Sequence, residues 1–163
     1  MSFVSVVFGV LVVAFTLCAA VIDIRTRKIP NWLTVPFCLA GIAFNLIWQG
    51  WAGLQASLLG FAAGFAIMFV LLLIGGGGAG DLKLMAALGA WLGPKSIVAV
   101  FLLSSLVVML ISAVILLARL ASRLAAPPGE QRAHQRIGVT YALPVACGTW
   151  LVLAWMLIVK GMP

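Results

Sequence analysis

The sequence predicts an all-α fold: a polytopic membrane protein with six transmembrane helices, of which the fourth is short. Composition is the first observation behind this prediction. Of 163 residues, 65% are hydrophobic and only 8% carry a formal charge, whereas a soluble domain has about 25% charged residues. The second observation is a set of long uncharged runs. Together they exclude a soluble globular enzyme, a disordered chain and a small secreted domain held by disulfides.

The uncharged runs define the predicted spans in order. A spanning helix needs about 20 apolar residues. The run over residues 29–80 is more than twice that length, so it must hold two spans, which the glycine-containing stretch 49–53 divides. The long spans are expected at 3–22, 32–48, 54–74, 97–118 and 139–159. A short helix over about 82–93 follows a glycine run, and it crosses by tilt or local thinning of the bilayer, or is partly re-entrant.

The basic residues predict the orientation of these helices, because cytoplasmic loops are enriched in Lys and Arg. If the short helix crosses fully, one side of the membrane receives eight of the ten basic residues, namely Arg25, Arg27, Lys28, Lys83, Arg119, Arg123, Arg132 and Arg136. The other side receives only Lys95 and Lys160. Both termini are therefore expected on the non-cytoplasmic side. Since the basic residues mainly record orientation, the net charge of +7 does not indicate nucleic-acid binding. The expected partner is the lipid bilayer, and no nucleic acid is expected.

Tryptophan and cysteine residues complete the membrane prediction. Tryptophans gather at membrane interfaces, so three are expected at the outer interface, namely Trp48, Trp51 and Trp91. Trp32 is expected at the inner one. The cysteines form no Cys-x-x-Cys pair and are expected to be small buried side chains rather than metal ligands; they are Cys18, Cys38 and Cys147.

Two aspartates are the candidate functional residues, because ionisable groups at membrane depth are costly and usually functional. Glu130 is the third acidic residue of the chain and lies in a basic loop, where it serves solubility. Asp23 ends the first span and Asp81 follows the third, so both lie at the cytoplasmic face and can meet. Two facing carboxylates share a proton. The ionised one can take a proton from water while the protonated one polarises an amide.

Each aspartate also has a purely structural interpretation. Asp23 precedes the basic stretch 25–28 and can pair with these interfacial cations. Asp81 begins a helix, where a carboxylate accepts hydrogen bonds from backbone N–H groups. Neither interpretation explains why the only two aspartates of the chain fall on one face, so we favour a functional pair.

The residues around the aspartates favour irregular backbone. Pro30 disfavours helical geometry at Ile29, so a short basic turn is expected there, after which Asn31 can cap the next helix. The run 75–80 contains five glycines, which permit close approaches that a Cβ atom would block. An open backbone beside the carboxylates suits a bound substrate strand, although a simple joint between helices needs the same residues. Lys83 can tune a carboxylate, bind a substrate acid, or reach the interface as a snorkelling lysine.

At these positions the sequence resembles the type IV prepilin peptidases, bacterial relatives of the archaeal preflagellin peptidases. The resemblance rests on Asp23 with Ile29-Pro30-Asn31, and on Gly78-Ala79-Gly80-Asp81 with Lys83. It extends over essentially the whole chain, which implies one transmembrane aspartic peptidase domain over residues 1–163.

The resemblance implies a Gly-x-Gly-Asp endopeptidase of the bacterial inner membrane that removes the leader peptide of type IV pilin-like precursors at the cytoplasmic face. It implies that Asp23 and Asp81 are the catalytic pair, that Gly78 and Gly80 shape the active-site loop, and that no metal or cofactor takes part. Long family members carry an extra segment with paired Cys-x-x-Cys motifs and also methylate the new N-terminus. This sequence lacks that segment and looks like the peptidase-only form that accompanies tight-adherence (Flp) pili.

The substrates implied by the resemblance are pilin or pseudopilin precursors. Such precursors have a basic leader, a glycine before the cut, and an apolar helix with an acid near its start. The candidates for binding that acid are Lys83, Arg25, Arg27 and Lys28.

Two other interpretations are open. Gly-x-Gly-Asp proteases of the presenilin or signal-peptide-peptidase type are similar in chemistry, but they are larger and have more spans. A small transporter or assembly subunit would use Asp23 and Asp81 to bind protons or cations. Transporter sites usually lie near the membrane midplane, often between internal repeats, whereas here both acids fall at one interface and the sequence shows no repeat.

Overall fold

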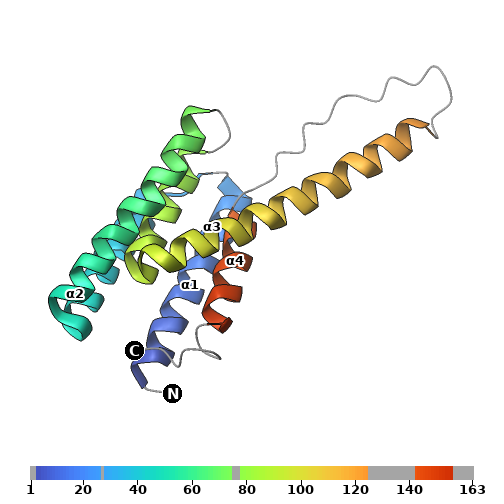
Figure 1. The fold of residues 1–163 in the computed structure, drawn as a ribbon. Coiled ribbons are helices and arrows are strands. Elements are labelled where there is room, and N and C mark those ends of the chain that lie inside the picture. Colours follow the sequence, from blue (N-terminus) through green and yellow to red (C-terminus); the bar gives the residue numbers. More distant parts are fainter. Residues whose placement is uncertain (1–2, 27, 75–77, 125–141, 156–163) are drawn as a thin grey trace.

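The computed structural model describes residues 3–26, 28–74, 78–124 and 142–155, and these residues are helical apart from short connections. The helices are α1 (Phe3–Thr26), α2 (Asn31–Leu73), α3 (Ala79–Leu124) and α4 (Ala142–Trp155) (Figure 1). The all-α prediction is confirmed. By length and composition, α1, α2 and α3 each contain a stretch that can cross a membrane, and α4 contains a shorter apolar one.

Helices α2 and α3 each turn back at a glycine. The backbone leaves helical geometry at Gly50, where φ is 60°, and at Gly93, where φ is 76°, a region that residues with a Cβ rarely adopt. Pro94 follows the second glycine and cannot donate a helical hydrogen bond. The chain reverses at both places (Figure 1), close to the divisions that the sequence predicted. The halves of α2 are hereafter residues 31–49 and 51–73, and those of α3 are residues 79–92 and 94–124.

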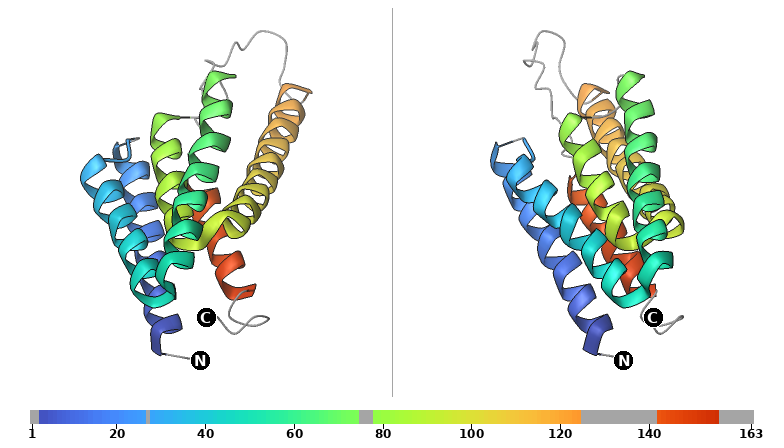
Figure 2. Two further views of the ribbon diagram at one scale, coloured as in Figure 1. Left: turned by 60° about the vertical axis from the view of Figure 1, so that its left-hand side comes forward. Right: turned by 90° about the vertical axis from the view of Figure 1, so that its left-hand side faces the viewer.

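The helical segments run alternately up and down, so their connections lie at two ends of the molecule (Figure 2). One end holds the end of α1, both ends of α2 and the start of α3, and we call it the acid end because it carries Asp23 and Asp81. The opposite end holds the reversals at Gly50 and Gly93, and we call it the glycine-turn end. A straight α2 would measure about 65 Å at 1.5 Å per residue, more than twice a hydrocarbon core of about 30 Å, so the reversal lets each half match a bilayer.

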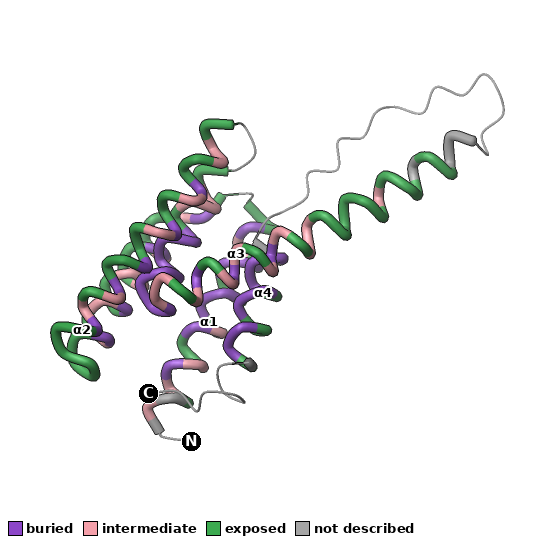
Figure 3. The backbone as a smooth tube through the Cα atoms, viewed as in Figure 1, coloured by how far each residue is buried: buried purple, intermediate pink, exposed green. Residues whose placement is uncertain are grey.

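The first half of α3 is the centre of the bundle. Every residue from 84 to 92 is buried (Figure 3), and α3 packs against α2 and α4. This segment was expected to cross by tilt or bilayer thinning, or to be partly re-entrant. The structure gives another reason for its shortness, because other helices rather than lipid surround it.

Trp91 lies in this core, so the prediction that it sits at the outer interface was wrong. Its side chain is only 4% exposed, and its Nε1 donates a hydrogen bond of 2.7 Å to the carbonyl oxygen of Phe37. The rings of Phe8, Phe37 and Phe44 surround the indole at centroid distances of 4.9–5.5 Å. The other predicted interface tryptophans are exposed, and these are Trp32, Trp48 and Trp51.

Glycines allow the second half of α2 to touch the first half of α3. A Cβ atom on Gly60 would collide with the backbone of Gly89, and one on Gly89 would collide with the backbone of Gly60. Gly64 lies in the same way against the backbone of Met85. Such small residues let membrane helices pack with their backbones in contact.

Polar side chains from α2 complete the hydrogen bonding at the glycine-turn end. Pro94 has no N–H group to offer the carbonyl of Ala90, four residues earlier. The amide Nδ2 of Asn45 donates to the carbonyl oxygens of Ala90 and Trp91, at 3.0 and 3.3 Å. The hydroxyl of Ser57 also donates to Ala90. Side-chain donors from α2 therefore take the place of the backbone N–H group that Pro94 lacks.

The outer surface of the bundle is apolar. The second half of α3 extends away from the other helices (Figures 1 and 2), and most of its described side chains are exposed (Figure 3). The prediction that the cysteines are buried was wrong for Cys18 and Cys147, which are exposed. A helix that crosses a membrane has a lipid-facing side as well as a buried one, and the sequence does not distinguish them at these positions.

Candidate active site

Asp23 and Asp81 come together at the acid end. Asp23 lies in the last turn of α1 and is only 9% exposed, and Asp81 lies in the first turn of α3 and is half-buried. The two carboxyl groups lie within electrostatic reach of each other. Repulsion between like charges is stronger where water is partly excluded. The structure thus brings together the two acids that the sequence singled out.

The turn between α1 and α2 contacts the start of α3. The hydroxyl of Thr26 donates to the carbonyl oxygens of Ile22 and Lys28, both at 2.9 Å, and this closes the end of α1. Ile29 follows in non-helical geometry and is buried. A Cβ atom on Gly80 would lie 3.4 Å from the Ile29 side chain, so this residue pair joins the turn to the helix that carries Asp81.

Asp81 also stabilises the start of its own helix. Its Oδ2 accepts a hydrogen bond of 3.2 Å from the N–H group of Gly78, and the N–H of Leu82 donates to the carbonyl of Gly78 at 3.2 Å. A side chain at the third helical position that binds the capping N–H is half of a capping box. The structural interpretation of Asp81 is therefore correct in part. A carboxylate has about four acceptor positions, so the hydrogen bond from Gly78 leaves the Asp81 side chain able to accept others.

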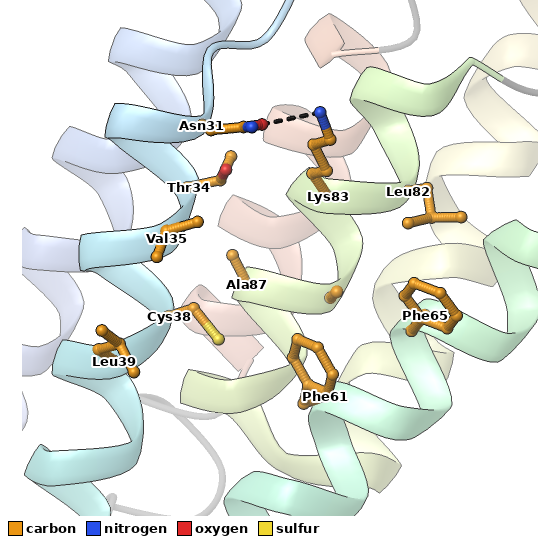
Figure 4. A pocket seen from close by; sticks show the side chains of 11 residues that line it. Asn31, Thr34, Val35, Cys38, Leu39, Phe61, Phe65, Leu82, Lys83 and Ala87 are labelled. Atoms are coloured by element: carbon orange, nitrogen blue, oxygen red, sulfur yellow. Dashed lines mark hydrogen bonds between the residues drawn. The ribbon is translucent and has the colours of Figure 1, made fainter.

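A hydrogen bond joins the two sequence motifs directly. The ammonium group of Lys83 donates to Oδ1 of Asn31 at 2.7 Å (Figure 4). The expectation that Asn31 caps α2 was wrong, because Pro30 is the capping residue and no side chain makes the cap hydrogen bond. The Asn31 side chain instead connects the start of α2 to the start of α3, one helical turn or less from Asp81.

The remaining predicted site residues have the following positions. Gly78 precedes α3 and Gly80 lies in its first turn, so both adjoin Asp81. Arg25 and Lys28 are exposed beside the turn after Asp23. Arg27 and residues 75–77 of the glycine run lie outside the described residues. Within the described part of the chain, no group of three or more His, Cys, Asp and Glu side chains is placed to hold a metal ion.

A groove at this site was not predicted from the sequence. It is framed by residues 31–39 of α2, by Phe61 and Phe65 of its second half, and by residues 82–87 of α3, and it has a volume of about 390 Å³ (Figure 4). The Lys83–Asn31 hydrogen bond lies at its end. Positions 31, 34, 35, 38 and 39 share one helical face, which is a signal in the sequence, but only the fold shows what this face opposes.

The model of the type IV leader peptidase family matches residues 10–117, which include both aspartates. The chain belongs to the type IV leader peptidase family. No solved structure matches it significantly.

Several curated members of this leader peptidase family are similar to the chain, and three examples carry the name prepilin leader peptidase/N-methyltransferase. The protein from Burkholderia pseudomallei strain 1026b is 40% identical over 60% of this chain and 35% of its own length. That from Aeromonas hydrophila is 34% identical over 82% of this chain and 44% of its own length. That from Xanthomonas campestris is 31% identical over 91% of this chain and 50% of its own length. The chain therefore spans half or less of these relatives.

Proposed function

We propose that the chain is a membrane-embedded aspartic endopeptidase that removes the leader peptide of type IV pilin-like precursors, of the Flp type, at the cytoplasmic face of the inner membrane. The observation that carries this proposal is the meeting of Asp23 and Asp81 at one end of a bundle whose family is named for leader cleavage. The two acids belong to helices that are remote in sequence, and the fold places both at the same end of the bundle.

The pair is proposed to hydrolyse an amide bond, with one proton shared between the two carboxyl groups. The ionised carboxylate takes a proton from water as the water oxygen attacks the carbonyl carbon. The protonated carboxylate donates to the carbonyl oxygen, which stabilises the tetrahedral intermediate. The C–N bond then breaks, the leaving amine receives the proton that water gave up, and one hydroxyl of the intermediate returns a proton to the other carboxylate as the new carboxyl group forms. Two acids with coupled titrations can exchange these roles within one cycle.

The surroundings of the pair suit an extended peptide. A scissile bond must be free of helical hydrogen bonds before it can be attacked, so the backbone beside the acids has to leave room for a strand. Gly78 and Gly80 are proposed to shape the backbone next to Asp81, where Gly78 keeps the space beside the carboxylate free of a Cβ atom. The cations at this end are proposed to bind an acidic residue of the substrate, and these are Lys83, Arg25, Arg27 and Lys28. The activity proposed for Asp23 and Asp81 is that of the peptidase.

The proposed topology has six crossings with both termini on the non-cytoplasmic side. The reversals at Gly50 and Gly93 supply the two turns that this topology needs within α2 and α3. It predicts that a reporter fused after Asn31 or after Arg123 reports the cytoplasm. A periplasmic signal at either position would contradict the topology.

The function is tested by co-expressing the chain with an Flp-type pilin precursor in a host without leader peptidases. Leader removal is followed by gel mobility and by sequencing the new N-terminus. We expect the wild-type chain to cut the precursor and Asp23→Asn and Asp81→Asn to abolish cutting. Glu130→Gln is the matched control, because it removes the third carboxylate of the chain and should leave cleavage unchanged. Cleavage by either folded Asp variant would overturn the catalytic pair, and an uncut precursor with the wild-type chain would favour a transporter or assembly subunit.

A further inference from the structure

The groove beside the acid pair has the shape and chemistry of a binding site for an apolar helix. Its volume of about 390 Å³ leaves room for side chains from one face of a helix that lies along its opening. Its walls are apolar side chains such as Val35, Leu39 and Phe61, and its floor contains the small side chains of Ala86 and Ala87. The floor residues are buried, whereas Val35 and Leu39 are 53% and 61% exposed, so the groove is open toward the surrounding lipid.

Three rigid elements frame the groove. The α2 residues on one wall recur at helical spacing and therefore belong to one face. On the other wall, Phe61 and Phe65 are stacked at a centroid distance of 6.2 Å, and Phe65 and Phe69 at 5.6 Å. Figure 4 shows the two walls facing each other across the first half of α3. Walls that are held by packed helices form a site before any ligand arrives.

The groove ends at the candidate active site. The Lys83–Asn31 hydrogen bond lies at this end. Lys83 follows Asp81 by two residues, and Asn31 follows Ile29, which contacts Gly80. A chain that leaves the groove past Lys83 therefore emerges at the acid end of the bundle, which carries Asp23 and Asp81. Because the groove opens at the end where the proposed cleavage takes place, a peptide is the occupant that this continuity favours.

We propose that this groove binds an apolar helical segment of the precursor next to the cleavage site, so that the peptide bond at the end of the segment reaches Asp23 and Asp81. This proposal rests on the proposed function. It assigns to Val35, Leu39, Phe61 and Phe65 a role in substrate affinity rather than in chemistry.

Photo-cross-linking tests occupancy of the groove without requiring catalysis. A benzophenone amino acid is placed at position 35 of the Asp81→Asn chain, which is co-expressed with the Flp-type precursor. The control label replaces Val70, which is 53% exposed like Val35 but lies outside the groove. We expect cross-links from position 35 to the apolar segment of the precursor and none from position 70. Adducts with lipid alone, or equal cross-linking from both positions, would overturn the proposal.

Filling the groove tests the same proposal through kinetics. Val35→Trp should raise KM for the precursor about tenfold, which corresponds to the loss of a modest apolar contact, and should leave kcat within about twofold. Val70→Trp should change neither value. An unchanged KM in folded Val35→Trp would contradict the proposed role of the groove in substrate binding. Cleavage by the wild-type chain would still support the proposed function in that case. If the wild-type chain does not cut the precursor, the proposed function fails, and cross-linking still decides whether the groove binds it.

Discussion

The two ends of the first half of α3 both gather polar groups, but for opposite reasons. At the glycine-turn end, Asn45 and Ser57 donate to carbonyls that the break at Pro94 deprives of helical partners. Such hydrogen bonds stabilise the fold, because an unpaired buried carbonyl costs about 1–3 kcal/mol. At the acid end, Asp23 and Asp81 lie within electrostatic reach of each other, and two carboxylates placed this way favour a shared proton over two charges. The polar groups of the glycine-turn end therefore maintain the fold, whereas those of the acid end are the ones that we propose to serve chemistry.

The largest expected effect concerns the acid end. Asp81→Asn should lower leader removal by about 10³-fold, within the range that general acid–base groups contribute. The same change should not lower the thermal midpoint in detergent, because the amide oxygen can still accept the Gly78 N–H and the repulsion from Asp23 is removed. Cleavage is measured by gel mobility and unfolding by intrinsic tryptophan fluorescence. A large drop in the midpoint would mean that Asp81 mainly stabilises the fold, and the contrast between the two ends would disappear.

The second effect concerns the helix contact between the two ends. Gly60→Ala should lower the free energy of unfolding by about 2–3 kcal/mol, as overpacking does, because its Cβ would collide with the backbone of Gly89. Gly9→Ala is the matched control: nothing lies within 4 Å of its Cβ, and alanine favours a helix over glycine by about 0.5–1 kcal/mol. Stability is measured by denaturant titration in detergent micelles. Equal stability of the two variants would show that the helices do not pack this closely.

The third effect concerns the glycine-turn end. Asn45→Leu should lower the free energy of unfolding by about 1.5 kcal/mol, because the carbonyl of Trp91 loses the donor that the structure gives it. Cleavage per folded molecule should stay unchanged, in contrast to Asp81→Asn. Gln49→Leu is the control, since Gln49 is exposed and its amide donates a long hydrogen bond of 3.5 Å to Oδ1 of Asn45. A specific loss of cleavage in folded Asn45→Leu would show that this end also serves chemistry.

Much of the fold follows from local features of the sequence. The long uncharged runs predict the helices, and the breaks near Gly50 and Gly93 follow from residues whose conformational preferences are local. The placement of Asp23 and Asp81 at one end follows from counting reversals between them. These inferences need only the length of a helix and the direction in which the chain turns.

The rest depends on which side of each helix meets which neighbour. Trp91 was expected at an interface, and only the packing around α3 shows that it is buried. Asn31 was expected to cap its helix, but its partner is Lys83, 52 positions away. The groove and the Gly60–Gly89 contact also arise between segments that are far apart in the chain. No periodicity within one helix specifies such pairings.

The smallest expected effect distinguishes two glycines of the acid end. A Cβ atom on Gly78 would lie 3.0 Å from Oδ2 of Asp81, whereas one on Gly80 would lie at an ordinary distance of 3.4 Å from Ile29. Gly78→Ala should therefore displace the carboxylate by a few tenths of an ångström and lower kcat by about fivefold, since small misplacements of reacting groups are costly. Gly80→Ala should change kcat by less than about twofold. Both variants should fold, because neither position has a backbone conformation that excludes alanine. If Gly80→Ala were the more damaging change, the contact between the turn and α3 would matter more for cleavage than the exact position of Asp81.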